Sequence, residues 1–253
     1  MKKGIQALLQ RLLGFENYLF WFCRFKVATF KWESRSKEGD FVAFLDLLQP
    51  TDNVIDIGAN IGIMSTLLAQ KVTKGRVISI EPVPENFRAL ERVVRHYRFE
   101  NVTTAQLALG ETQGELTMTM PVMNGVRMQG LSHVKHDSIA GYDTAVMEFT
   151  VPVKRLDQLS ELEGLDIHGI KIDVENYEQF VLRGGTAILE EYMPVIYCEL
   201  WPNQNRNNVF NLLTGIGYGI FVNTDKGLVK YQEGLHSQHN FFFLPPGRNL
   251  NPN

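Results

Sequence analysis

An apolar segment that ends abruptly in a turn of small residues limits the fold more than any other feature of this chain. Residues 53–57 are typical of a buried strand, and Gly58 follows at once. Apolar residues at helical spacing over 63–72 then lead to a second apolar strand at 76–80. Because parallel strands are joined by crossover helices, this order predicts a parallel sheet with helices on both faces.

The same alternation continues along most of the chain. The further predicted elements are a helix from Pro84, a strand near 102–107, a strand at 167–174, a helix over 178–191, a strand at 195–200 and a helix near 209–213. The last strands, 218–222 and 241–244, are expected to form an antiparallel hairpin at one sheet edge, with a turn at 225–227. The predicted fold class is therefore α/β, mostly parallel with an antiparallel C-terminal edge.

Composition and charge exclude several classes of protein. A chain of 253 residues with 44% apolar residues can bury a core, and its net charge of −3 argues against a nucleic-acid partner. Two cysteines, Cys23 and Cys198, form neither a disulfide framework nor a four-ligand zinc site, which favours a reducing compartment. The apolar run 18–23 is far shorter than the about 18 residues of a membrane span. We expect a cytoplasmic protein without a transmembrane segment.

Residues 1–40 are predicted to form a helical appendage to a domain that spans 41–253. The first 37 residues hold eight basic, two acidic and eight aromatic side chains, which leaves two interpretations. The segment docks on its own domain or on a twin subunit of a homodimer, or it contacts a membrane surface as a basic amphipathic helix. The aromatic residues do not keep a strict helical face, which favours docking.

The alternation pauses over 111–155, where we expect inserted strands and a loop over the acceptor site, that is, the part of the pocket that would hold a substrate. Apolar and threonine side chains alternate over 116–120, as in an edge or hairpin strand. Five of the eight methionines fall in this insertion: Met118, Met120, Met123, Met128 and Met147. Flexible methionine side chains predict an adaptable cover over a pocket. The alternative is a hairpin that makes no contact with substrate.

The turn at 58–62 and the acidic residue after the second strand predict a nucleoside site. In a parallel sheet Glu81 reaches the same crevice as the turn, where its carboxylate can accept both hydroxyls of a ribose. A dinucleotide fingerprint would need glycines where Asn60 and Ile63 stand, and no Lys-Ser/Thr pair completes a P-loop. A nucleoside without phosphate, such as S-adenosylmethionine, fits better than NAD.

Four motifs in this order resemble the FkbM family of S-adenosylmethionine-dependent methyltransferases: Ile55-Asp56-Ile57-Gly58-Ala59-Asn60-Ile61-Gly62, Ile80-Glu81-Pro82, Ala108-Leu109-Gly110 and Ile170-Lys171-Ile172-Asp173-Val174-Glu175. The resemblance runs from about Phe41 to Pro245. It implies a Rossmann-like sheet of seven strands and methyl transfer to a hydroxyl of a sugar or small metabolite. Asn176 stands where the family usually has glycine, and asparagine tolerates unusual backbone angles better than most residues.

The resemblance also implies the residues that hold the cofactor. The Gly58–Gly62 turn would hold the methionine part, with Asp56 supporting its ammonium group, and Glu81 would bind the ribose. The adenine would lie between Pro82 and Val83 on one side and Leu107 and Ala108 on the other. The full expected cofactor set is Asp56, Gly58, Ala59, Asn60, Gly62, Glu81, Pro82, Val83, Leu107, Ala108 and Asp173.

The catalytic group is expected among acids and histidines near the strand ends. An alcohol acceptor needs a base or a cation at its oxygen, so Asp173, Glu199 and His133 are the catalytic candidates. Two roles stay open for Asp173, Glu175 and Glu199, which all fall at or just beyond strand ends: they share a divalent ion, or one of them is the base. His136 and His239 are weaker candidates, and no metal ligand set is assigned.

Two functions from different classes follow. The first is an O-methyltransferase that acts on a sugar or small metabolite. The alternative is a cofactor-binding module without catalysis, in which Asn176 marks a lost acceptor site. Formation of S-adenosylhomocysteine separates the two, whereas an oxidoreductase would conflict with the glycine spacing.

Overall fold

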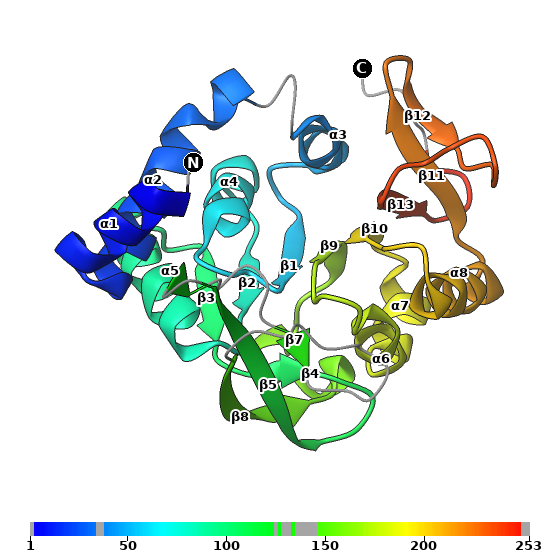
Figure 1. Cartoon of the computed structure of the whole chain (residues 1–253). Helices are drawn as coiled ribbons and strands as arrows, with labels where there is room; N and C mark the ends of the chain where they lie inside the picture. The colour runs from blue at the N-terminus through cyan, green and yellow to red at the C-terminus, as the bar shows by residue number, and fades with distance from the viewer. Residues whose placement is uncertain (1–2, 34–37, 124–125, 128–132, 135–145, 249–253) are drawn as a thin grey trace.

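The centre of the molecule is an eight-stranded sheet (Figure 1). The computed structural model describes residues 3–33, 38–123, 126–127, 133–134 and 146–248. The strand order is β12-β11-β13-β10-β9-β1-β2-β3. The bounds are β1 Asn53–Ile57, β2 Val77–Ile80, β3 Val102–Ala105, β9 Ile167–Ile172, β10 Val195–Glu199, β11 Gly219–Thr224, β12 Gly227–Lys230 and β13 Asn240–Leu244. Strands β10, β9, β1, β2 and β3 are parallel, and the pairings of β13 with β10, β13 with β11 and β11 with β12 are antiparallel.

Helices cover both faces of this sheet, as the alternation predicts. Their bounds are α3 Gly39–Leu47, α4 Ile63–Lys71, α5 Pro84–Tyr97, α6 Glu178–Arg183, α7 Thr186–Tyr192 and α8 Gln204–Ile216. Residues of α3 and α4 share one buried cluster with the sheet, and residues of α6, α7 and α8 share another on the opposite face. The chain passes from β1 towards β2 on one side and later enters β9 on the other. This switch in direction leaves a crevice at the carboxyl ends of the strands.

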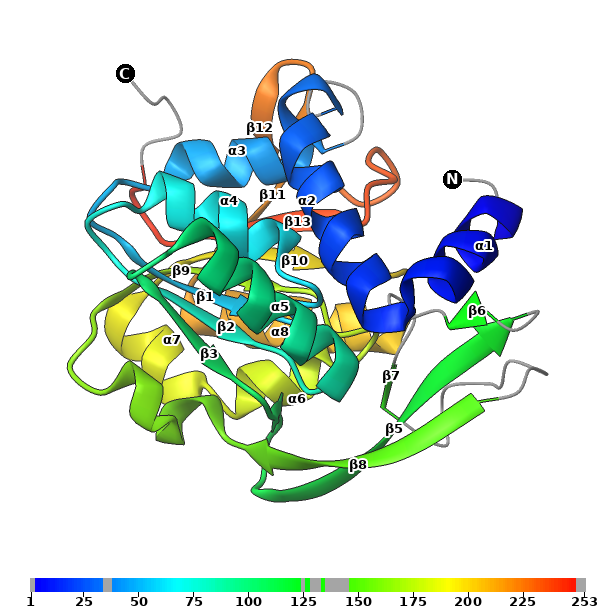
Figure 2. The same ribbon diagram turned by 90° about the vertical axis from the view of Figure 1, so that its left-hand side faces the viewer.

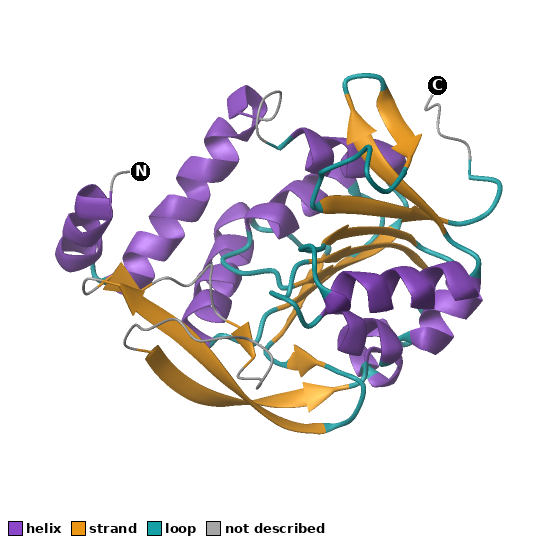
Figure 3. Ribbon diagram, turned by 45° about the vertical axis from the view of Figure 1, so that its right-hand side comes forward, coloured by secondary structure: helices purple, strands orange, loops and turns teal. Residues whose placement is uncertain are grey.

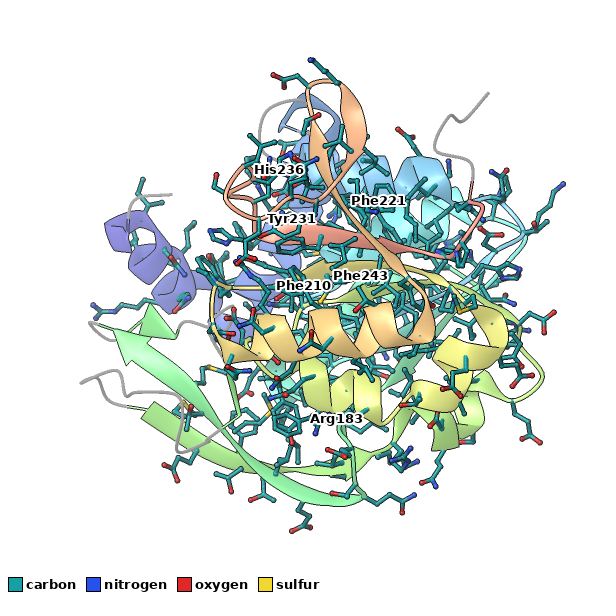
Figure 4. The ribbon with its side chains drawn as sticks, turned by 90° about the vertical axis from the view of Figure 1, so that its right-hand side faces the viewer. Arg183, Phe210, Phe221, Tyr231, His236 and Phe243 are labelled. Atoms are coloured by element: carbon teal, nitrogen blue, oxygen red, sulfur yellow. The ribbon has the colours of Figure 1, made fainter. Side chains whose placement is uncertain are left out.

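Aromatic side chains join α8 to the antiparallel end of the sheet. Figure 4 shows Phe210 of α8 facing Phe243 of β13, with Tyr231 beside them. The ring centroids of Phe210 and Tyr231 are 5.5 Å apart, and those of Phe210 and Phe243 are 6.0 Å apart, both edge to face. This packing fixes β13 against the sheet next to β10.

A second, smaller sheet is inserted after β3. Its strands are β4 Ala108–Leu109, β5 Gly114–Met123, β6 Val126–Arg127, β7 His133–Val134 and β8 Val146–Lys154. Figure 3 shows β5 and β8 as a long antiparallel ribbon beside the central sheet. Met118 and Met120 are buried in its apolar cluster, whereas Met147 is exposed. The structure confirms a strand here, but burial does not alternate along it, because Thr119 is buried as well as its two methionine neighbours. Met128 and His136 lie outside the described residues.

Two helices precede the α/β unit, α1 Lys3–Leu13 and α2 Phe15–Glu33. The buried side of α2, with Leu19, Phe20 and Cys23, packs on Ala89 and Val93 of α5. Figure 2 shows α2 lying across the helical layer, with α1 outside it. In the part of the chain that the structure describes, no helix combines the length and the apolar character of a bilayer span.

Two details of the fold differ from the sequence expectation. The described part of the large sheet has eight strands instead of seven. The turn before Gly227 joins β11 to an additional strand, β12, and β13 lies between β10 and β11. The expected helix over 178–191 is two helices, broken at Gly184. A Cβ atom at Gly184 would lie 2.1 Å from the carbonyl oxygen of Gly110, so the chain passes too closely there for a side chain.

Candidate active site

A cleft opens at the carboxyl ends of β1, β2 and β9 and is bordered by β4 and β5 of the small sheet. It encloses about 670 Å³ of empty space, including the part that is open to solvent, which suits a small-molecule ligand. Residues from all four sequence motifs line it together: Gly58, Asn60, Glu81, Pro82, Ala108, Leu109, Asp173 and Glu175. The position agrees with the general rule that open α/β sheets bind ligands at the switch in strand direction.

The turn after β1 is held in one conformation by hydrogen bonds to the end of β2. Gly58 has φ 74°, and a Cβ atom there would lie 1.9 Å from the carbonyl oxygen of Asp173. The backbone amides of Gly58 and Ala59 both donate to the carbonyl oxygen of Ile80 at 3.0 Å. Asn60 follows with φ 51°. Only glycine allows the approach of Asp173 at position 58, which brings β9 against the turn.

Glu81 lies in the floor of the cleft and is buried, with 4% of its surface exposed. Its Oε2 atom accepts a hydrogen bond from the amide of Asn60 at 2.8 Å, and its Oε1 atom accepts one from the amide of Val83 at 2.9 Å. The side-chain amide of Asn86 donates to Oε1 at 3.3 Å. Burial raises the pKa of Glu81 to about 7, although these hydrogen bonds and the charge of Lys171 act to lower it.

An apolar slot continues the cleft beside Glu81. It contains the four residues predicted to flank an adenine: Pro82, Val83, Leu107 and Ala108. Three further residues complete it, namely Leu109, Met118 and Tyr177, and none of them was predicted from the sequence to bind the cofactor. Met118 comes from the inserted sheet, so this insertion borders the cleft. The signal in the sequence was its place in a methionine-rich segment where apolar and threonine residues alternate.

Asp56 is fully buried below the turn and is absent from the cleft lining. Its Oδ1 atom lies 3.1 Å from Nζ of Lys171, and its Oδ2 atom accepts a hydrogen bond from the hydroxyl of Ser65 at 2.6 Å. The Lys171 ammonium also donates to the carbonyl oxygen of Gly58 at 2.8 Å. Asp56 therefore supports the turn from beneath through a buried cation. Ala59 and Gly62 are likewise outside the lining, although both belong to the turn.

Lys171 is a site residue that sequence reasoning missed. Burial lowers its pKa, but the charges of Asp56 and Asp173 outweigh this, and the pKa lies above its usual value. The ammonium group thus stays charged in the interior, with 6% of the side chain exposed. A lysine inside the apolar run of 167–172 was the signal, because a charged residue in a buried strand needs a partner.

Acidic side chains gather where β9 and β10 end. Asp173 and Glu175 line the cleft, and Glu199 ends the adjacent strand β10. Burial, together with the charges of Asp173, Glu199 and Glu178, raises the pKa of Glu175 to about 7. Burial also raises the pKa of Glu199, with Asp173 adding to the effect. In the described ranges, no three histidine, cysteine or acidic side chains are placed to hold a metal ion.

The turn after Asp173 adopts the unusual backbone that Asn176 was expected to tolerate. Glu175 has φ 51° and Asn176 has φ 71°, so two consecutive residues are left-handed. The buried carboxylate of Glu178 accepts hydrogen bonds from the amides of Val174 and Asn176, at 3.4 and 3.2 Å. Burial raises the pKa of Glu178 to about 7, although its hydrogen bond with Asn205 acts to lower it. The turn that carries Glu175 is therefore held by the carboxylate of Glu178, the first residue of α6.

Histidines contribute little to the described cleft. The backbone of His133 lies in β7, paired with Thr119, and its side chain is outside the described residues. Nδ1 of His239 lies 3.3 Å from a guanidinium nitrogen of Arg206. The His239 ring stacks on Trp201, with 4.5 Å between the centroids.

Comparisons with known proteins agree with this geometry. The profile described as "Methyltransferase FkbM domain" matches residues 56–247. "Methyltransferase 1" of Beauveria bassiana (strain ARSEF 2860) is 31% identical over 147 residues, which are 53% of this chain and 59% of that protein. "Methyltransferase sdnD" of Sordaria araneosa is 27% identical over 192 residues, which are 66% of this chain and 73% of that protein.

A solved structure supports the fold. The "Methyltransferase FkbM" of Methylobacillus flagellatus KT aligns with a TM-score of 0.53 at 18% identity, covering 78% of this chain and 44% of that one. The chain thus spans about half the length of this protein and of the Beauveria bassiana relative. The family profile includes the cleft residues from Gly58 to Glu175. The chain belongs to the FkbM family of S-adenosylmethionine-dependent methyltransferases.

Proposed function

We propose that this chain binds S-adenosylmethionine in the cleft and transfers its methyl group to a hydroxyl of a sugar or small metabolite. The observation that carries the proposal is the position of Glu81. A buried carboxylate lies between the Gly58 turn and an apolar slot, at the end of the strand next to β1. The carboxylate can accept a hydrogen bond from a ribose hydroxyl, and the apolar slot can hold an adenine. S-adenosylmethionine carries no phosphate, so no phosphate site is required.

Different residues of the cleft would bind different parts of the cofactor. Glu81 has one acceptor position left after its three protein donors, on Oε2, because each carboxylate oxygen can accept two hydrogen bonds. A ribose hydroxyl would use this position. The adenine would lie between Val83 and Ala108 in the slot, and the methionine part would lie along Gly58 and Asn60. Asp56 would act indirectly, by holding Lys171 under the carbonyl of Gly58.

When bound, the cofactor supplies an electrophilic methyl group. The protein then has to align the acceptor oxygen, exclude water and accept the hydroxyl proton. Asp173, Glu199 and His133 are the proposed catalytic residues. Of the two whose side chains the structure describes, Asp173 lines the cleft. Glu175 joins them as a candidate base, because a pKa of about 7 is better matched to accepting a proton near neutral pH than that of an ordinary carboxylate.

Two alternatives are separated from this proposal by experiment. Binding of S-adenosylmethionine without turnover would favour a cofactor-binding module. A divalent ion at the acidic side chains would make turnover depend on magnesium and sensitive to a chelator. The arrangement of the inserted sheet over the acceptor is part of the proposal, supported by Met118 at the cleft.

The decisive experiment starts with calorimetric titration of ligand-free protein with S-adenosylmethionine and, separately, with NAD. We expect micromolar binding of the sulfonium cofactor alone. Acceptor screening with neutral glycosides, with and without magnesium, would then be followed by mass spectrometry of S-adenosylhomocysteine. Failure of S-adenosylmethionine to bind would overturn the cofactor site. Binding without turnover across the acceptor panel would support the binding module.

A further inference from the structure

Helix α1 carries an apolar stripe that faces solvent. Ile5, Leu8 and Leu12 follow one another at helical spacing and are 52%, 56% and 71% exposed. Leu9 instead joins the buried cluster between α2 and α5. The helix therefore uses one side to dock on the protein and leaves a second apolar side uncovered. Figures 1, 2 and 3 all show α1 at the periphery of the molecule, outside α2.

Helix α2 adds exposed aromatic side chains next in the chain. Trp21 and Phe25, one helical turn apart, are 50% and 60% exposed. The guanidinium carbon of Arg24 lies 4.8 Å from the centroid of the Trp21 ring. An arginine over an exposed tryptophan places a cation beside an amphipathic ring, a combination typical of the boundary between lipid headgroups and acyl chains.

The aromatic residues of α2 stay exposed although the helix is already packed on the protein by its other side. Glu16 accepts a hydrogen bond from Nε of Arg88 at 2.7 Å, and the side chain of Asn17 accepts one from Arg92 at 2.6 Å. The Arg92 guanidinium also lies 4.0 Å above the Phe20 ring. With Phe20 fixed on α5, Trp21 and Phe25 remain on the outside.

Charge decides between the partners that this surface could take. Residues 1–37 hold eight basic and two acidic side chains, a charge of +6 in a chain of net −3. A second copy of this segment would bring two strongly positive surfaces together, which is unfavourable. An anionic lipid surface instead attracts basic residues and accepts apolar side chains. We propose that α1 and the Trp21 turn of α2 form a docking surface for an anionic membrane.

The test uses the full chain with sedimented vesicles of phosphatidylcholine, alone or with about 30% phosphatidylglycerol. Binding should be much stronger to the anionic vesicles and should weaken as salt screens the charges. Leu12→Glu should weaken binding at least about tenfold, because it removes a leucine side chain that would be buried in the lipid when the protein binds. The matched control is Leu235→Glu, since Leu235 is also 71% exposed but lies in the segment between β12 and β13.

A charge-reversal pair tests the electrostatic part. Arg11→Glu should weaken binding to anionic vesicles, whereas Lys226→Glu, at the exposed turn between β11 and β12, should not. Circular dichroism and S-adenosylmethionine titration would show that each variant is folded. Equal binding to both vesicle types, or an unchanged Leu12→Glu variant, would overturn the proposal. A dimer in light scattering that Leu12→Glu dissociates, without vesicle binding, would instead show that a second copy covers this surface.

Discussion

The ammonium group of Lys171 lies 3.1 Å from the carboxylate of Asp56, and both side chains are almost completely buried. This pair joins the two strands that border the switch in strand direction, β9 and β1. The same ammonium donates to the carbonyl oxygen of Gly58, the first residue of the turn after β1. The pair is therefore a structural support for the turn, placed one layer below the cleft.

Replacing Lys171 with methionine should destabilise the protein and weaken cofactor binding. Removal of one partner leaves the Asp56 charge buried without compensation, which typically costs about 3–5 kcal/mol of unfolding free energy. Urea unfolding and calorimetric titration with S-adenosylmethionine would measure the two effects. The double variant Lys171→Met/Asp56→Asn should recover part of the stability, because it removes the unpaired charge. A single variant as stable as the wild type would contradict the role of the pair.

Glu81→Ala should weaken S-adenosylmethionine binding roughly 10- to 150-fold, the effect of one charge-assisted interaction. The reason is the loss of the acceptor for a ribose hydroxyl in the floor of the cleft. Titration calorimetry measures it, with Glu100→Ala as the control, since Glu100 is exposed beyond the end of α5. Unchanged affinity would exclude the ribose assignment.

The pH dependence of binding offers a separate test of Glu81. Only the ionised carboxylate is acceptor-only, and its pKa is raised to about 7. Affinity for the cofactor should therefore rise by up to about tenfold between about pH 6 and pH 8, as the ionised fraction increases. Glu81→Gln should bind more weakly and show a flatter profile in that range. An identical slope in this variant would assign the pH effect to another group.

The element order of the parallel sheet could be predicted because each strand and helix is encoded locally. The apolar run of β1, the small turn after it and the spacing of α4 are all visible within a few residues. The order of the antiparallel strands could not be derived in the same way. β13 lies between β10 and β11 because of pairing between distant segments, and the turn at Gly227 is compatible with either hairpin.

The cleft could be predicted in outline for a similar reason. Glu81 and the Gly58 turn are each marked by their position at a strand end. The role of Asp56 could not be read from its motif, because its partner Lys171 comes from a distant strand. A carboxylate at the end of an apolar strand looks the same whether it faces the ligand or a buried cation.

The free protein should become less stable as pH rises from about 5 to about 8. The folded-state pKa values of Glu81, Glu175 and Glu178 are about 7, above their usual value of 4.5. Their stabilising contribution is thus fully present below pH 4.5 and is lost as pH rises through about 7. Urea unfolding across this range measures the slope. Glu178→Gln should reduce it, and a slope equal to that of the wild type would remove Glu178 from the explanation.

Gly58→Ala should abolish cofactor binding and lower stability by more than its backbone angle explains. A Cβ atom at this position meets the carbonyl oxygen of Asp173 at 1.9 Å, so β9 and the turn must separate. Gly164→Ala is the matched control, because Gly164 has the same φ of 74° and nothing within 4 Å of its added Cβ atom. The control should lose only the about 1–2 kcal/mol of a left-handed alanine. Thermal unfolding and titration with S-adenosylmethionine would compare the two variants. Equal losses would mean that the contact with Asp173 does not constrain the turn, and that the backbone angle alone makes glycine necessary there.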